Sequence, residues 1–205
     1  VAAPVRDDDP VNPPLHSRTF DGPGLWGMVV TLLSNGTLFL SLLFGWFYLW
    51  TVAPNWQIPD HKAFSISGLF ISGVSLTLAT WIYLNTLKRL RQKNDLQLEG
   101  RLWISTLLGF FHIALLIFIF AAADLRPRTM AHDAILCVMM LYLLLHSSMV
   151  TIATMLQALR VRKGYVSRTL PYEPMVLQPL WLYCLSIYWI SLAVFLLLPQ
   201  MRGLA

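Results

Sequence analysis

Five long apolar runs without a charged residue constrain this chain more than any other feature of its sequence. Each run exceeds the roughly 20 residues that a helix needs to cross the hydrocarbon core of a bilayer. A bilayer core offers no water to backbone groups, so a run of this kind is expected to form an α-helix, which satisfies those groups internally. The sequence therefore predicts an all-α integral membrane bundle of five transmembrane helices within residues 25–205. The runs are residues 25–53, 63–87, 102–123, 134–159 and 175–198.

The composition favours the same class of protein. Hydrophobic residues make up 57% of the chain and charged residues only 12%. A soluble domain of this size needs more charge on its surface than that. The formal net charge of +5 could suggest nucleic acid as a partner. However, the basic residues lie in short segments between the apolar runs, which is typical of membrane topology and not of a phosphate-binding face.

Residues 1–24 form a polar, proline-rich segment without hydrophobic periodicity, and we expect a disordered tail there. Three consecutive aspartates in this tail, Asp7 to Asp9, are interpreted as a solvated charge cluster, with a cation site as the alternative. No signal-peptide pattern precedes the first run. The chain begins with Val1. Either the initiator methionine was removed or the chain is a piece of a longer polypeptide.

Lysine and arginine are distributed unequally between the two sides of the predicted bundle. Eleven fall on the side of the N-terminus and four on the other side, so the positive-inside bias places the N-terminus in the cytoplasm and the C-terminus outside. The eleven are Arg6, Arg18, Lys88, Arg89, Arg91, Lys93, Arg101, Arg160, Arg162, Lys163 and Arg168, and the four are Lys62, Arg126, Arg128 and Arg202. Tryptophans near the run ends suit an interfacial belt, and they are Trp26, Trp50, Trp56, Trp103 and Trp181.

Small residues recur every three or four positions in the second and fourth runs. This spacing puts them on one face of a helix, where a neighbouring backbone can approach closely. We therefore predict helix packing along both stripes, with a pore lining as the alternative. The stripes are Ser65, Gly68, Ser72, Ser75 and Ala79 in the second run, and Ser147, Thr151, Thr154 and Ala158 in the fourth.

The apolar runs contain few groups that could do chemistry, and His112 and His146 are their only ionisable candidates for a functional site. Two histidines on separate helices could ligate haem or copper if they faced each other. The favoured interpretation is that each forms a hydrogen bond to a neighbouring helix or a lipid headgroup. Cys137 and Cys184 have no metal-ligand spacing. The sequence holds no recognisable nucleophile, zinc or phosphate-loop motif, so we expect no catalytic residue and no metal ligand in this chain.

The first run resembles the signature helix of subunit III of the haem-copper (cytochrome c) oxidases. It opens with Trp-Gly-Met and closes in an aromatic segment, as that helix does. The residues that fit are Trp26, Gly27, Met28, Gly36, Phe39, Phe47 and Tyr48. Residues 88–110, 145–150 and 181–189 are similar to later segments of the same family, in the same order. The helix number matches five-helix variants of subunit III, which occur alone or fused behind subunit I.

The chain departs from the family where the family carries acids and histidines. The acidic position of the first helix is Asn35 in this chain, and the second histidine of the fourth-run motif is Met149. These departures put in doubt any part that the family's acids play in proton uptake. The other replaced positions are Leu116 and Ile119 in the third run, and Tyr183 and Ser186 in the last.

The resemblance implies a structural subunit in a bacterial cytoplasmic (inner) membrane, with no cofactor of its own. Haem and copper would belong to the partner, the catalytic subunit I, which reduces oxygen with electrons from cytochrome c or quinol. Phospholipid is an expected ligand, and Arg160, Arg162 and Lys163 are possible contacts for its phosphate, unless they serve topology alone. The alternatives are a freestanding accessory protein of a nitric oxide reductase system and a small membrane transporter or channel.

Overall fold

A computed structural model describes residues 23–52, 65–91, 98–123, 125–128, 130–163 and 172–194. Every regular element in these ranges is helical, which confirms the predicted all-α class for the part of the chain described. The helices are α1 (Pro23–Val52), α2 (Ile66–Arg91), α3 (Leu98–Ala122), α4 (Ala131–Arg162) and α5 (Tyr172–Leu192). Almost all of the predicted tail and the C-terminal end of the chain lie outside the described residues.

Four of the five helices are long and apolar enough to cross a membrane, which indicates a membrane protein. These four are α1 to α4. The apolar part of α5, Leu177–Leu192, is shorter than the roughly 20 residues that a crossing needs. A fifth crossing therefore stays a prediction.

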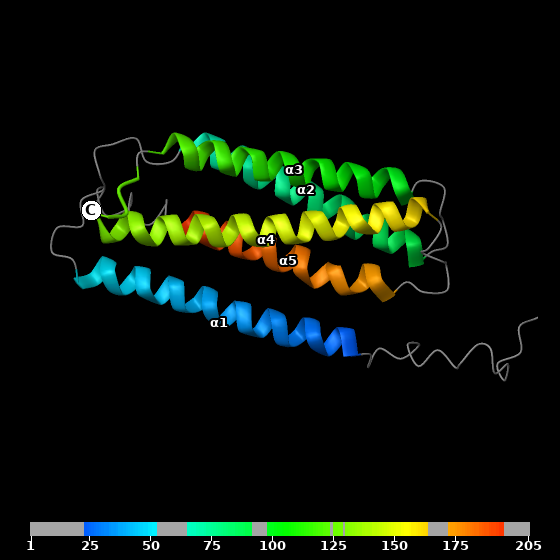
Figure 1. The fold of residues 1–205 in the computed structure, drawn as a ribbon, viewed down its shortest axis with the longest axis horizontal. Helices are drawn as coiled ribbons and strands as arrows, with labels where there is room; N and C mark the ends of the chain where they lie inside the picture. Colours follow the sequence, from blue (N-terminus) through cyan, green and yellow to red (C-terminus); the bar gives the residue numbers. More distant parts are fainter. Residues whose placement is uncertain are drawn as a thin grey trace, which may run out of the picture.

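Helices α2 to α5 form a four-helix bundle, and α1 lies outside it (Figure 1). Around the bundle, α2 packs on α3, α3 on α4, α4 on α5, and α5 on α2. Helix α1 lies against α4 and α5 with far fewer contacts. Phe39 and Trp46 are its only fully buried apolar side chains among those described. Helix α1 thus adds two side chains to the buried core and otherwise lies on the outside of the bundle.

Helices α2, α3 and α4 extend beyond the apolar runs into charged residues. Lysine, arginine and glutamate are good helix formers, so the backbone continues its hydrogen bonding past the last apolar residue. Their long side chains can reach water while the stem stays on apolar surface. The Lys, Arg and Glu residues in these terminal turns are Lys88, Arg89 and Arg91 of α2, Glu99 and Arg101 of α3, and Arg160 and Arg162 of α4. Asp133 at the start of α4 is instead buried and accepts a hydrogen bond from the backbone N–H of Arg126.

The predicted stripe of the second run packs against α3. Ser72, Ser75 and Ala79 are buried. The hydroxyl of Ser75 donates to the carbonyl of Leu108 across 3.0 Å, and the hydroxyl of Ser105 donates to the carbonyl of Ala79 across 3.0 Å. The packing prediction is confirmed for these members, while Ser65 just before α2 is exposed.

The stripe of the fourth run is also buried, as predicted. Its members Ser147, Thr151, Thr154 and Ala158 are all nearly inaccessible. A Cβ atom added to Gly109 of α3 would lie 2.5 Å from Oγ1 of Thr151. Only a glycine lets the α3 and α4 backbones approach this closely.

Trp181 corrects the predicted aromatic belt. Its side chain is fully buried, and its indole N–H donates to Oγ1 of Thr154 across 3.0 Å. Its ring lies beside that of Tyr83, with 5.8 Å between centroids. Trp181 therefore faces the interior of the bundle and is not part of a belt that faces lipid, because a hydroxyl of α4 provides the partner for its indole N–H.

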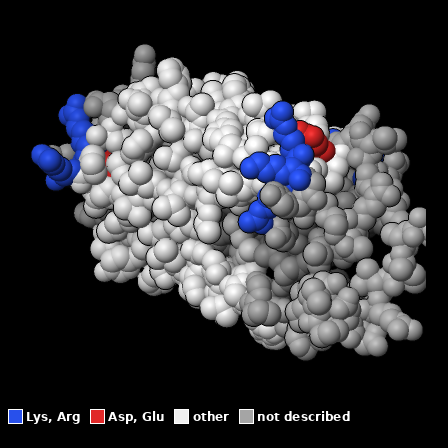
Figure 2. All heavy atoms as spheres, turned by 45° about the vertical axis from the view of Figure 1, so that its right-hand side comes forward, with Lys and Arg blue, Asp and Glu red and all other residues white. Residues whose placement is uncertain are grey.

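Charged side chains gather at two ends of the molecule, with an uncharged band between them (Figure 2). Among the described side chains, six Lys and Arg residues lie at the end where α2 and α4 finish and α3 begins. Two lie at the opposite end. The larger group is Lys88, Arg89, Arg101, Arg160, Arg162 and Lys163, and the smaller is Arg126 and Arg128.

Candidate functional site

His112 lies at the centre of the bundle and is fully buried. Its Nδ1 is 2.9 Å from the carbonyl oxygen of Ser72 and 2.8 Å from that residue's hydroxyl. Its Nε2 is 3.2 Å from the hydroxyl of Ser147. We assign the neutral ring in which the Nδ1–H donates to the Ser72 carbonyl and the Ser147 hydroxyl donates to Nε2. Both ring nitrogens then have partners on other helices.

The fourth helix of the bundle also meets this ring. Tyr188 of α5 contacts His112 edge to face, with 5.2 Å between ring centroids. The Tyr188 hydroxyl donates to the carbonyl of Leu69 on α2 across 2.6 Å. His112 therefore links α3 to α2 and α4 by hydrogen bonds and touches α5, which agrees with the predicted role in helix bonding.

His146 lies in a different environment, on the side of α4 that faces α1 and α5. Its Nδ1–H donates to the carbonyl of Tyr142, one turn earlier in its own helix, across 2.9 Å. The ring lies against Tyr142 and Tyr183, with centroid separations of 4.1 and 5.8 Å. Its hydrogen bond is thus local and not to a neighbouring helix as predicted, and its contact with a neighbouring helix is aromatic.

Tyr142 joins three helices next to His146. Its hydroxyl donates to the backbone carbonyl of Asn35 in α1 across 2.9 Å. Since that uses its single proton, the hydroxyl of Tyr183 in α5 is the donor in the 2.6 Å contact between the two tyrosines. The side-chain amide of Asn35 donates to the carbonyl of Thr31 in its own helix. Asn35 thus takes part through its backbone.

The two histidines consequently belong to two separate groups of hydrogen bonds. His112 is held by serines of α2 and α4, and His146 lies with the tyrosines where α1, α4 and α5 meet. In the described ranges, no three His, Cys, Asp or Glu residues gather where they could hold one metal ion. The arrangement around each histidine suits helix association.

The residues of the first-helix motif are spread along α1 and do not converge. Trp26, Gly27 and Tyr48 are exposed, whereas Met28, Asn35 and Gly36 are half-buried. Phe39 is buried and stacks on Tyr142, with 6.1 Å between ring centroids. The motif therefore contributes one deep packing contact to this chain, and its other members are exposed or half-buried.

One face of α1 carries small residues and is open. Five small residues of α1, named at the end of this paragraph, project within about 40° of one direction when each residue turns the helix by 100°. A Cβ added to Gly27 or Gly45 would meet no atom within 4 Å. The hydroxyls of Thr31 and Ser41 donate to carbonyls of α1 itself. The small residues of this face are Gly27, Thr31, Ser34, Ser41 and Gly45, all exposed except the half-buried Gly45. Leu38, which is 51% exposed, projects in the same direction between Ser34 and Ser41.

The predicted phosphate contacts lie at the end of α4. Arg160, Arg162 and Lys163 are exposed there. Nε of Arg162 is 3.9 Å from Oε1 of Glu99 at the start of α3. An exposed ion pair at this distance stabilises the fold little, but it shows that the start of α3 lies beside the end of α4.

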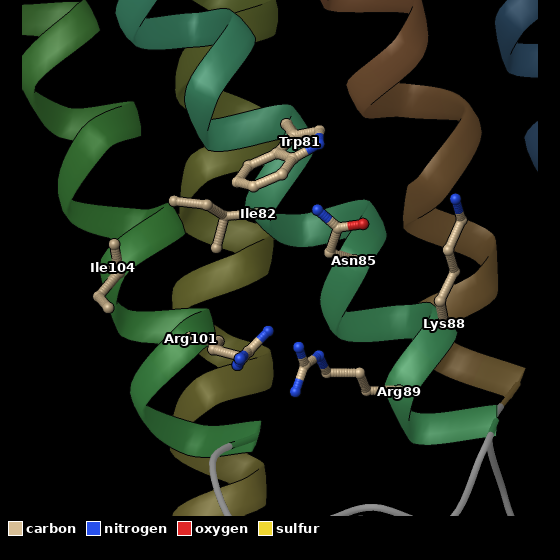
Figure 3. A pocket seen from close by; sticks show the side chains of 7 residues that line it. All are labelled: Trp81, Ile82, Asn85, Lys88, Arg89, Arg101 and Ile104. Carbon is tan, nitrogen blue, oxygen red and sulfur yellow. The ribbon is translucent and has the colours of Figure 1, made fainter.

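A pocket that the sequence reasoning missed lies at the same end of the bundle, between α2 and α3. It has a volume of about 690 Å³. Its described lining is Trp81, Ile82, Asn85, Lys88, Arg89, Arg101 and Ile104 (Figure 3). The spacing of Trp81, Asn85 and Arg89, four residues apart, could have indicated a polar-to-apolar stripe on α2. Nothing in the sequence shows that Arg101 completes it.

A comparison with models of known protein families and with curated proteins gave no match to this chain. The likeness to oxidase subunit III therefore rests on the motif residues themselves.

Proposed function

We propose that this chain is a non-catalytic, structural subunit of a respiratory haem-copper oxidase, similar to subunit III. Its partner is the catalytic subunit I, which holds haem and copper and reduces oxygen with electrons from cytochrome c or quinol. The chain crosses a bacterial cytoplasmic membrane five times, with its N-terminus in the cytoplasm and its C-terminus outside. Its role is to pack on the catalytic subunit and to bind phospholipid.

The observation that carries this proposal is the open small-residue face of α1. Lipid does not need small residues, whereas helix partners use them to bring backbones together. Gly27, Ser34 and Ser41 lie on this face. The first-helix motif that resembles subunit III lies on the same helix. We propose that a transmembrane helix of the larger subunit packs on this face.

The polar groups of the interior support a structural role. Both ring nitrogens of His112 are hydrogen-bonded to serines of two other helices. The tyrosines near His146 form hydrogen bonds to each other and to the α1 backbone. Such bonds fix helices against each other. A transporter would instead need polar side chains that face one water-filled path.

The membrane orientation follows from charge. The end with Lys88, Arg101 and Arg160 carries the larger group of basic residues. The positive-inside bias assigns that end to the cytoplasm.

The first test is a mild-detergent purification through a tag on this chain, followed by an optical spectrum and identification of the co-purifying proteins. We expect a haem signal and a large multi-helix subunit. A haem spectrum with nitric oxide reductase activity would favour the accessory-protein alternative. A colourless protein without partners would contradict the proposal and favour a transporter or channel.

A pair of variants tests the α1 face directly. Gly27→Leu combined with Ser41→Leu adds bulk to the open face, where neither residue is buried. We expect this variant to fold and to lose the co-purifying subunit. Leu33→Phe, at a position that is 69% exposed on another side of α1, adds bulk without touching the face. Equal retention of the partner by both variants would place the contact elsewhere.

A further inference from the structure

The pocket between α2 and α3 combines positive charge with apolar walls. Of its seven described lining residues, three carry a positive charge and none a negative charge. A volume of about 690 Å³ is within the range of small-molecule sites. The pocket therefore has the size and the charge to hold an anionic group.

Two arginines form its polar end. Figure 3 shows the guanidinium groups of Arg89 and Arg101 pointing toward one another from α2 and α3. The planar N–H donors of a guanidinium match the oxygens of a phosphate group. The side chain of Asn85, one turn before Arg89 on α2, also lines the pocket and lies between the arginines and Trp81 (Figure 3).

The apolar end lies deeper along the helices. Trp81, Asn85 and Arg89 share one face of α2, and Ile104 follows Arg101 by one turn on α3. The eight residues from Trp81 to Arg89 correspond to about 12 Å at 1.5 Å per residue. Trp81 is 62% exposed and Ile104 is 50% exposed, so this end opens toward the surrounding membrane.

We propose that this pocket binds the phosphate group of an anionic phospholipid. Arg89 and Arg101 hold the phosphate oxygens, and an acyl chain lies along Trp81 and Ile104. A free phosphate ion would use the polar end alone, whereas a phospholipid uses both ends. The proposal rests on the part of the proposed function that places the chain in a membrane, and not on the identity of its protein partner.

The test uses the full chain in nanodiscs of phosphatidylcholine, titrated with phosphatidylglycerol. Bound lipid is counted by native mass spectrometry, and the unfolding temperature is measured in parallel. In the variant Arg89→Gln/Arg101→Gln we expect phosphatidylglycerol to bind about 30-fold more weakly, from about 1 kcal/mol per basic residue. The matched control, Arg126→Gln/Arg128→Gln, removes the same charge from exposed side chains at the other end of the bundle and should bind nearly as the unmodified chain does.

Three results would overturn the proposal. One is an equal loss in both double variants, since that shows a diffuse surface charge. Another is an unchanged affinity in Arg89→Gln/Arg101→Gln. The third is stabilisation by inorganic phosphate, in phosphatidylcholine alone, that matches the effect of phosphatidylglycerol, because this identifies a soluble phosphate as the ligand.

Single variants keep the test valid if the double variant does not fold. Arg89 is exposed, so Arg89→Gln should leave the bundle intact and weaken phosphatidylglycerol binding about fivefold. Ile104→Ser should weaken lipid binding without changing the response to inorganic phosphate. Neither measurement requires the proposed oxidase partner, so a failure here leaves the co-purification result unaffected.

Discussion

Replacing His112 with phenylalanine tests whether one ring holds the bundle together. Phenylalanine has a similar shape, so the substitution removes the hydrogen bonds with little change in packing volume. The lost partners are Ser72 on α2 and Ser147 on α4. Interhelical hydrogen bonds in membrane proteins average about 0.6 kcal/mol and reach about 1.7 kcal/mol. Two such links give an expected loss of about 1–3 kcal/mol in the free energy of unfolding.

The matched variant is His146→Phe. His146 is also buried, but its hydrogen bond goes to a carbonyl of its own helix. We expect it to cost less than about 1 kcal/mol, because no interhelical bond is lost. Both variants are unfolded reversibly in mixed micelles by raising the fraction of a denaturing detergent. Circular dichroism follows the helices, and tryptophan fluorescence follows their packing.

A double-mutant cycle then isolates the link between α3 and α4. His112→Phe and Ser147→Ala are measured singly and together. If the 3.2 Å contact stabilises the fold, the two losses are not additive, with a coupling of about 0.5–1.7 kcal/mol. The reasoning is refuted if His112→Phe is as stable as the unmodified chain, or if His146→Phe is the more damaging of the two.

Three further predictions use other contacts. Gly109→Ala should destabilise the chain by about 1–3 kcal/mol in the same detergent titration, because its new methyl group meets Thr151 at 2.5 Å. Gly27→Ala has open space around it and should not destabilise the chain. Equal losses of stability in the two variants would contradict the close approach of α3 and α4. Trp181→Phe should cost about 1 kcal/mol and shift the fluorescence of the folded state, because it removes the bond to Thr154; an unchanged stability would show that this hydrogen bond does not stabilise the fold. Asn35→Asp should change the turnover of the purified complex little, since the family's other acidic positions are apolar in this chain; a large pH-dependent gain in oxygen consumption would refute this.

Several features of the fold could be predicted from the sequence because they depend on local properties. The length of an uncharged apolar run decides whether a helix can cross a bilayer, and this holds whatever the run packs against. Small-residue stripes likewise identify a packing face from spacing alone. Ser72, Ser75 and Thr154 were placed correctly in this way. The helix ends were less accurate, because charged residues such as Arg89 continue a helix that hydrophobicity alone would end.

The candidate sites depend on which helices become neighbours, and a single sequence does not contain that information in readable form. Trp181 has the position of an interfacial residue, yet the rotation of α5 turns it toward Thr154. His112 and His146 are similar in sequence terms, but of the two only His112 forms hydrogen bonds to two other helices. Arg89 and Arg101 lie together because α2 ends and α3 begins at the same end of the bundle.

The sequence by itself determined that this chain consists of apolar helices with charge at their ends. That property follows from the solvent, since a bilayer excludes charge and unsatisfied backbone from its core. The tertiary structure decided that α1 stands apart, that a histidine joins the four-helix bundle, and that two arginines meet over an apolar wall. These features depend on the rotation and crossing of pairs of helices, which side-chain packing sets only when the helices come together.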